Sequence, residues 1–174
     1  MAYNKMTKQM AETPAGTSIR HVTDNKKRYL KLLLLGDEQE SMIDRYLERG
    51  DMSVMLDSYG RAIAVAVMTD EGGGVCELKN IAVAPDCQRK GYGATLVEHL
   101  CNGCKGKYHT MLVGTGSTAG TLKFYERCGF TYSHTVKDFF TDNYDHKIIE
   151  DGKELRDMIY LRRILAATPD AAKG

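Results

Sequence analysis

The first sign of chemistry in this sequence lies at the start of one expected helix, in the segment Gln88-Arg89-Lys90-Gly91-Tyr92-Gly93-Ala94. The first amides of a helix lack acceptors within the helix, and the helix dipole adds partial positive charge there, so an anion such as phosphate can bind. Gly91 and Gly93 would let the backbone approach the anion, while Arg89 and Lys90 would add charge. A tight strand-to-helix turn with solvated cations explains the same residues. The spacing fits neither the nucleotide-triphosphate loop G-x-x-x-x-G-K-[ST] nor the dinucleotide motif G-x-G-x-x-G.

The elements that must position this helix follow from hydrophobic periods and from the places of glycine and proline. The leucine-rich segment at residues 25–50 indicates two helices, which end near Gly36 and Gly50. Strands are expected at 18–22, 52–57, 62–69, 75–83, 109–115, 131–140 and 155–165, further helices at 91–104 and 119–129, and a loop at 141–153. This order predicts an α/β fold in which a mixed sheet of about seven strands is flanked by about four helices.

Two segments resemble the recurrent motifs of the GNAT superfamily of N-acetyltransferases. The segment "QRKGYGATLVEHL" at residues 88–100 matches the Q/R-x-x-G-x-G/A signature, and it follows a strand, "ELKNIAVAP", of the kind that precedes the signature in that family. The segment "LKFYERCGF" at residues 122–130 resembles a second family block with a Phe/Leu-Tyr-x-x-x-Gly-Phe core. The expected order of elements over residues 17–165 is also similar. The resemblance therefore implies the GNAT acyl-coenzyme A N-acyltransferase fold.

The resemblance further implies that acetyl-coenzyme A is the co-substrate, with no metal. Its pyrophosphate would lie on the backbone amides of the signature, and its pantetheine arm would pair with the preceding strand as though it were an added strand. An amide near Val83 would polarise the thioester oxygen. The implied coenzyme-binding residues are Ile81, Ala82, Val83, Gln88, Arg89, Lys90, Gly91, Tyr92, Gly93, Ala94 and Ser117.

Acetyl transfer to an amine requires that the amine lose a proton and that the departing thiolate gain one. The resemblance places Tyr125 near the coenzyme sulfur as the acid, and a buried aromatic beside Phe124 is the structural alternative. Glu77 lies four residues before Ile81, where some family members carry a catalytic glutamate, and a carboxylate withdrawn from water there would suit a general base. Lys79 lies two residues further on the same strand, so a structural Glu77–Lys79 ion pair is the alternative.

One segment departs from the family pattern. Many members carry an asparagine before the tyrosine helix, and this chain has "GTGSTAGTLKFY" at residues 114–125 instead. Ser117 or Thr118 would either contact the pantetheine arm through its hydroxyl or cap the helix, and capping is the favoured interpretation.

The acceptor is expected near the segment "KDFFTDNYDHKIIEDGKELRDM" at residues 137–158. In the family, the loop between the last two strands and the early two-helix region commonly form the acceptor pocket. Ring faces and carboxylates together suit a cationic amine, although a hydrophobic cluster with solvated acids explains them equally well. The aromatics are Phe139, Phe140 and Tyr144, and the acids are Asp138, Asp142 and Asp145.

Composition narrows the class of protein. The chain has 174 residues and a formal net charge of +1, which gives no overall field to attract nucleic acid or an anionic membrane. Its five cysteines are odd in number and lie in apolar or helical segments, which favours reduced thiols in the cytoplasm over a disulfide framework. Cys101 and Cys104 have C-x-x-C spacing without a second pair, so ordinary thiols are expected rather than a metal site. No apolar run is long enough for a membrane span.

These observations predict one catalytic domain at residues 17–165, with a flexible leader at 1–16 and a flexible tail at 166–174. The expected function is acetyl transfer from acetyl-coenzyme A to a primary amine, by direct attack in a ternary complex and with a small-molecule acceptor. A peptide or protein amine is the second choice of acceptor. A non-catalytic acyl-coenzyme A sensor and a nucleotide-binding protein are the competing classes. The protein is expected to be a monomer or a homodimer.

Overall fold

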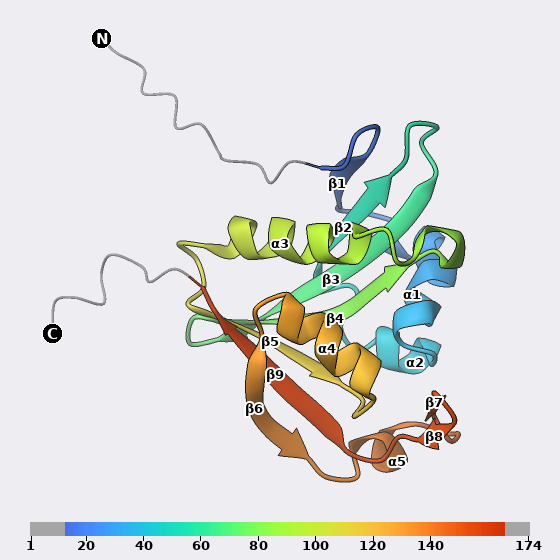
Figure 1. The fold of residues 1–174 in the computed structure, drawn as a ribbon, viewed down its shortest axis with the longest axis vertical. Coiled ribbons are helices and arrows are strands. Elements are labelled where there is room, and N and C mark those ends of the chain that lie inside the picture. The colour runs from blue at the N-terminus through green and yellow to red at the C-terminus, as the bar shows by residue number, and fades with distance from the viewer. Residues whose placement is uncertain (1–12, 166–174) are drawn as a thin grey trace, which may run out of the picture.

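A seven-stranded mixed sheet organises the protein in the computed structural model, which describes residues 13–165 (Figure 1). In chain order its strands are β1 (Ser18–Val22), β2 (Asp51–Leu56), β3 (Ala62–Gly72), β4 (Val75–Val83), β5 (Thr110–Thr115), β6 (Thr131–Val136) and β9 (Met158–Ile164). Their order across the sheet is β1-β2-β3-β4-β5-β9-β6. Each neighbouring pair is antiparallel except β4 with β5, which is parallel. The predicted mixed α/β fold is confirmed.

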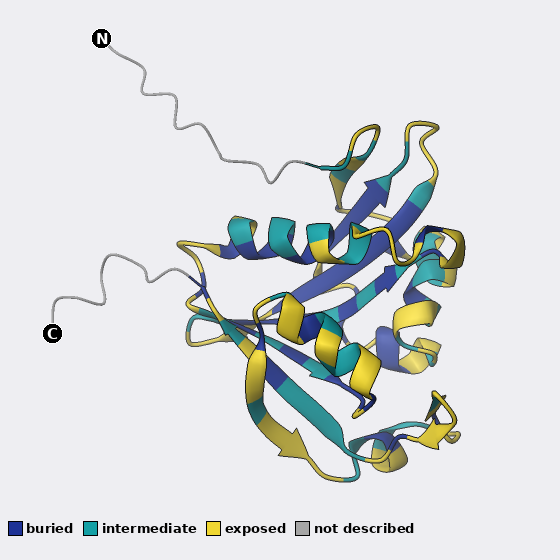
Figure 2. Ribbon diagram, viewed as in Figure 1, coloured by how far each residue is buried: buried dark blue, intermediate teal, exposed yellow. Residues whose placement is uncertain are grey.

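Helices cover both faces of the sheet, because its inner strands are apolar on both sides. In β3, Val65 and Val67 pack toward one face, while Ala64, Ala66 and Met68 pack toward the other. The first face carries the 3-10 helix η1 (Lys26–Tyr29), α1 (Leu30–Gly36) and α2 (Glu40–Ile43), and the second carries α3 (Tyr92–Cys104) and α4 (Ala119–Arg127). Figure 2 shows the resulting buried band along the inner strands, while β6 at one edge is largely exposed.

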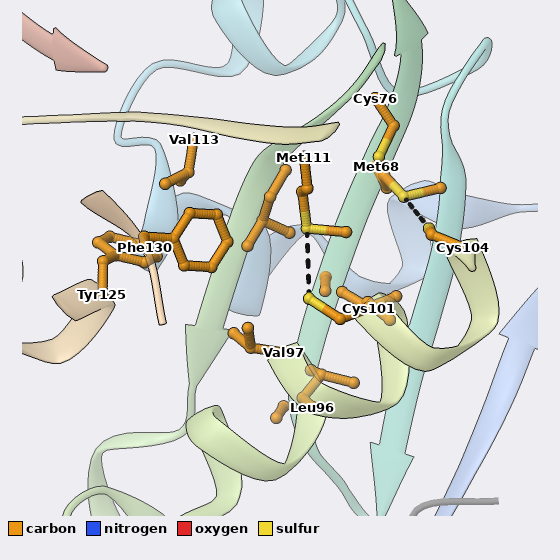
Figure 3. Packing of buried hydrophobic residues seen from close by; sticks show 14 of the residues in the cluster. Met68, Cys76, Leu96, Val97, Cys101, Cys104, Met111, Val113, Tyr125 and Phe130 are labelled. Atoms are coloured by element: carbon orange, nitrogen blue, oxygen red, sulfur yellow. Dashed lines mark hydrogen bonds between the residues drawn. The ribbon is translucent and has the colours of Figure 1, made fainter. Parts of the chain in front are cut away.

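Sulfur atoms fill part of the core beneath α3 (Figure 3). The Cys101 thiol lies 3.8 Å from the Met111 sulfur, and the Cys104 thiol lies 3.0 Å from the Met68 sulfur. Both cysteines are buried and free of disulfides, as is Cys76 nearby. The C-x-x-C pair therefore packs in the core as free thiols.

The parallel strands β4 and β5 pair over only part of their length, which leaves one edge of β4 unpaired near its end. Their register runs from Val75 opposite Thr110 to Leu78 opposite Val113, after which β4 continues to Val83 without β5 beside it. Lys79 is the extra residue of a β-bulge against β3, where Val67 pairs with Asn80 but Met68 pairs with Leu78. The sheet therefore forks, and the last residues of β4 have a free edge.

The segment after β6 differs from the prediction. A strand was expected at 131–140, but β6 ends at Val136 and α5 (Phe139–Asn143) follows. Asp138 adopts a left-handed backbone with φ of 55°, which turns the chain out of the strand, and its amide donates to Asp157. The expected loop 141–153 contains the hairpin strand β7 (Ile149–Glu150), and β8 (Lys153–Glu154) follows across a turn. Another short 3-10 helix, η2 (Pro85–Cys87), lies between β4 and α3.

The ends of the predicted domain are only partly described. Residues 1–12 of the expected leader and the expected tail at 166–174 lie outside the described residues, while 13–17 form a turn in which the Thr17 hydroxyl donates to the Pro14 carbonyl. Within residues 13–165, no helix is long and apolar enough to cross a membrane.

Candidate active site

The start of α3 presents a set of unpaired backbone amides. Gly91 is the N-cap residue and has φ of 84°, a left-handed conformation that glycine adopts without steric cost. The first bond of the helix runs from the Thr95 amide to the Gly91 carbonyl. The amides of Tyr92, Gly93 and Ala94, in the first turn of the helix, have no acceptor among residues 13–165. This end of α3 can therefore bind an anion.

A cleft of about 1150 Å³ lies over these amides and along the free edge of β4. It is lined by all the predicted coenzyme-binding residues except Lys90 and Ser117, namely Ile81, Ala82, Val83, Gln88, Arg89, Gly91, Tyr92, Gly93 and Ala94. The fork between β4 and β5 explains why an apolar strand borders a cleft, because the backbone of residues 79–83 has no β5 partner. The Gln88 side chain already occupies the Val83 carbonyl, with 3.0 Å between its Nε2 and that oxygen.

Gly93 serves helix packing as well as the cleft. A Cβ at this position would lie 3.3 Å from Cζ of Phe124 in α4, so only glycine admits that ring without displacement. At Gly91, by contrast, a Cβ would meet no atom within 4 Å. Glycine is therefore needed at the two positions for different reasons. Gly91 adopts a left-handed backbone conformation, and Gly93 allows the close approach of α4.

Tyr125 lies where the large cleft meets a second cavity of about 390 Å³. Its ring packs edge-on against Phe124 and Phe130, with centroids 5.1 and 5.8 Å apart. Burial raises the pKa of its phenol above the ordinary value of 10.0, and the nearby Cys128 and Glu150 add to the shift. Its hydroxyl makes no hydrogen bond with the described residues. A protonated hydroxyl without a protein partner is able to donate to a group in the cleft.

The second cavity is acidic. Its charged lining consists of Asp37, Glu38 and Glu150 against a single cation, Lys79, among the described residues. The Lys79 ammonium already pairs with Glu77, at 3.0 Å from Oε2. Burial raises the pKa of Asp37 above its ordinary value, although hydroxyls that donate to it oppose the shift.

Two distant segments close one side of this cavity. The Tyr144 hydroxyl donates to Asp37 at 2.8 Å, and the Asp145 amide donates to the Gln39 side chain at 2.9 Å. His146 and Glu38 add a contact of 3.1 Å. The residues after α5 thus dock on the loop between α1 and α2, and the contacts hold the two segments together across the cavity.

The predicted acceptor residues are only partly gathered here. Phe140 and Tyr144 line the second cavity, but Phe139, Asp138, Asp142 and Asp145 do not. Asp138 pairs with Arg156 instead. Of the acids that do line this cavity, Asp37 and Glu38 come from the α1–α2 loop, whereas Glu150 comes from the β7–β8 hairpin, within the expected acceptor segment 137–158. Sequence reasoning named both regions but did not single out these three acids; the helix stop at Gly36 was the available signal for Asp37 and Glu38.

The structure places Glu77 outside both cavities. Its carboxylate pairs with Lys79 through Oε2 and accepts a hydrogen bond from the Tyr160 hydroxyl at 3.2 Å through Oε1. Glu77 lies opposite Leu112 of β5, in the half of β4 that is still paired, so it lies below the fork. The Glu77–Lys79 ion pair, the alternative to a catalytic role, is therefore present, and the geometry favours this structural role for Glu77.

Thr118, rather than Ser117, is the N-cap residue of α4. Its hydroxyl does not cap the helix as expected but donates to Glu150, and Thr121 donates to the same carboxylate oxygen at 2.7 Å. Ser117 is exposed and lines neither cavity. The β7–β8 hairpin is thus tied to the start of the tyrosine helix.

Comparison with known proteins places this arrangement in a family. The chain is 36% identical over 132 residues to the uncharacterized N-acetyltransferase YvbK of Bacillus subtilis, which corresponds to 75% of this chain and 84% of that protein. The chain belongs to the GNAT family of acetyltransferases. The family model for the acetyltransferase (GNAT) domain also matches residues 48–132.

Solved GNAT structures share the fold of this acyltransferase over most of its length. A GNAT acetyltransferase from Elizabethkingia anophelis with bound acetyl-coenzyme A superposes with a TM-score of 0.83 at 33% identity, covering 87% of this chain and 100% of that one. A Bacillus subtilis acetyltransferase in complex with coenzyme A gives a TM-score of 0.78 at 32% identity, covering 86% and 99%. The predicted membership of the family and the predicted enzyme class are confirmed.

Proposed function

We propose that this acetyltransferase transfers an acetyl group from acetyl-coenzyme A to the primary amine of a small cationic molecule, by direct attack in a ternary complex. The observation that carries the proposal is the meeting of two cavities at Tyr125. One is large, borders the free edge of β4 and lies over the start of α3, while the other is smaller and acidic. A donor and an acceptor bound in them would meet beside one phenol, which is what a direct transfer requires.

The coenzyme fits the larger cleft by its chemistry. Its pyrophosphate would accept from the amides between Gln88 and Ala94, near the Arg89 side chain. The amides and carbonyls of its pantetheine arm would pair with the free edge of β4 at Ile81 and Val83. Coenzyme A and acetyl-coenzyme A are bound in the two solved relatives, and this supports the same co-substrate here.

The acidic cavity favours an ammonium over a neutral or anionic acceptor. Asp37 is half-buried, and its carboxylate accepts hydrogen bonds from the Tyr46 and Tyr144 hydroxyls at 3.2 and 2.8 Å. A bound cation would offset the charge that burial makes costly there. Tyr144 and Phe140 stack with ring centroids 5.6 Å apart and add aromatic surface to the same wall.

A small molecule is favoured over a protein chain because of the segment that docks across the cavity. An extended peptide needs an open groove, whereas the contacts of Tyr144, Asp145 and His146 with the α1–α2 loop close one side. The cavity volume of about 390 Å³ lies near the lower end of known ligand sites, which span about 300–1,000 Å³.

In the proposed reaction, the neutral amine attacks the thioester carbonyl carbon, the C–S bond breaks, and the thiolate takes the proton of the Tyr125 hydroxyl. The raised pKa of Tyr125 keeps that proton in place at neutral pH. The phenolate then regains a proton from the new amide nitrogen, directly or through water. Tyr125 acts as an acid within each turnover and ends it unchanged.

Thiol release from acetyl-coenzyme A across a panel of amines tests the function. The panel should contain diamines and polyamines, amino sugars, free amino acids and lysine peptides. We expect turnover with at least one small cationic amine and little with the peptides. Tight coenzyme binding without turnover on any amine would support the sensor instead. ADP binding as tight as coenzyme A binding would support the nucleotide-binding alternative.

A further inference from the structure

The junction of the two cavities holds one carboxylate that the proposed function has not used. Glu150, on the first strand of the β7–β8 hairpin, lines both the coenzyme cleft and the acidic cavity. Among the described residues, no other Asp or Glu lines both. Asp37 and Glu38 line only the acidic cavity, while Glu98 and Asp151 line only the cleft.

The hydrogen bonds of Glu150 leave one oxygen available. Thr118 and Thr121, both at the start of α4, donate to Oε1. Within residues 13–165, Oε2 accepts no hydrogen bond. Two hydroxyl donors on one oxygen fix the carboxylate in place, and the second oxygen is free to accept a proton from a bound group.

The backbone opposite Glu150 is shaped for this carboxylate. A Cβ at Gly116 would lie 3.3 Å from Glu150 Oε2 and 2.6 Å from Leu155 Cδ1. Glycine at the end of β5 therefore lets the hairpin approach the loop before α4. The hairpin, the loop and the tyrosine helix all meet at the point where donor and acceptor would meet.

We propose that Glu150 is the general base of the acetyl transfer, which deepens the proposed function and rests on it. Oε2 takes one proton from the substrate ammonium, and the freed nitrogen lone pair forms the bond to the thioester carbon. The nitrogen then loses a second proton, which restores the Tyr125 hydroxyl after that group has protonated the thiolate. Each turnover converts one ammonium and one thioester into one amide, one thiol and one proton. That proton passes from Glu150 to solvent.

The surroundings of Glu150 agree with this role. The titratable or charged groups around Glu150 are Tyr125 from α4, Lys153 opposite it in the register of β8, and Asp37, Glu38 and Lys79, which line the same acidic cavity. Glu77, the candidate from sequence, has both oxygens engaged and lies outside both cavities. Glu150 comes from a hairpin that sequence patterns did not predict.

The test compares Glu150→Gln with the matched control Glu154→Gln, which makes the same change on the other strand of the hairpin. Glutamine keeps an oxygen for the two threonine hydroxyls, so we expect unchanged coenzyme binding and an unchanged melting temperature. With the best amine of the panel, we expect kcat/KM at pH 7 to fall by about 100- to 10,000-fold in Glu150→Gln. Glu154→Gln should stay within about twofold, because that side chain lies on the surface.

The pH dependence of the rate and the choice of acceptor distinguish a general base from a residue that only holds the hairpin against α4. The loss in Glu150→Gln should shrink as pH approaches the pKa of the amine, and it should be much smaller with an alkoxyamine, which is already neutral at pH 7. Formate should partly restore Glu150→Ala by supplying a carboxylate. A loss that is the same at every pH and with both acceptors, or activity within threefold of wild type, would overturn the role of Glu150. Absence of wild-type turnover on every amine would instead overturn the proposed function itself, and with it this role.

Discussion

Replacement of Tyr125 by phenylalanine should separate catalysis from stability. The substitution removes a hydroxyl that makes no hydrogen bond with the described residues, while the ring contacts with Phe124 and Phe130 remain. The free energy of unfolding should therefore change by less than about 1 kcal/mol. Loss of a general acid typically costs about 100- to 10,000-fold in rate, which corresponds to about 2.7–5.4 kcal/mol of activation free energy.

The assay is steady-state thiol release with saturating acetyl-coenzyme A and the best amine, together with thermal melting. We expect a 100-fold or greater fall in kcat, while the dissociation constant for coenzyme A stays within about threefold because the hydroxyl is not needed for ground-state binding. Tyr108→Phe is the matched control, since that tyrosine is buried but lines neither cavity. It should leave kcat unchanged.

The pH dependence gives a second measure of the same residue. The pKa of Tyr125 is raised above 10.0, so its neutral, proton-donating form persists through the whole neutral and mildly alkaline range. Wild-type kcat should therefore show no fall from tyrosine ionisation below about pH 10. The acid role would be refuted by a Tyr125→Phe variant with kcat within threefold of wild type, or by a fall in kcat matched by an equal loss in Tyr108→Phe.

Three further substitutions test the coenzyme cleft, the acidic cavity and the core. Asp37→Asn should raise the free energy of unfolding at pH 7, measured in urea. The folded state raises the pKa of Asp37 above 3.8, so the neutral carboxyl contributes stability below that pH and this contribution is lost as pH rises through the raised pKa. The gain in stability of the variant over wild type should therefore vanish below about pH 4. The same variant should weaken amine binding. Gly91→Ala should raise the coenzyme A dissociation constant at least about tenfold in calorimetry, since its Cβ would strain a φ of 84° and enter the cleft. Lys26→Met should cost about 2–4 kcal/mol of unfolding free energy with kcat unchanged, because three backbone carbonyls lose a buried ammonium donor.

Each of these has a contrary result. A stability difference between Asp37→Asn and wild type that does not depend on pH would mean that ionisation of Asp37 carries no cost. Unchanged coenzyme affinity in Gly91→Ala would place the pyrophosphate away from the start of α3. Lys26→Met with wild-type stability would show that water replaces the ammonium, and a fall in kcat would link η1 to the active site.

Local patterns in the sequence determined most of the fold and the coenzyme cleft. Short runs of small and β-branched apolar residues along β2 and β3 predicted strands, because a strand buried on both faces reads as a continuous apolar run. The segment from Gln88 to Ala94 predicted an anion site, because the amides and the glycine that form it are contiguous in the chain. The Tyr125 helix was likewise readable from one short block. These features depend on neighbours within a few residues, so a sequence pattern contains them.

The acceptor side was decided by tertiary structure. Asp37 and Tyr144 meet across more than a hundred residues of chain, and no local pattern records such a contact. Glu77 lies below the fork of the sheet and pairs with Lys79, whereas Glu150 reached the junction because a hairpin docks on the start of α4. The sequence by itself determined where a helix start that can bind an anion lies. Only the folding of distant segments against one another decided which carboxylates line the acidic cavity, because burial and proximity are properties of the packed chain.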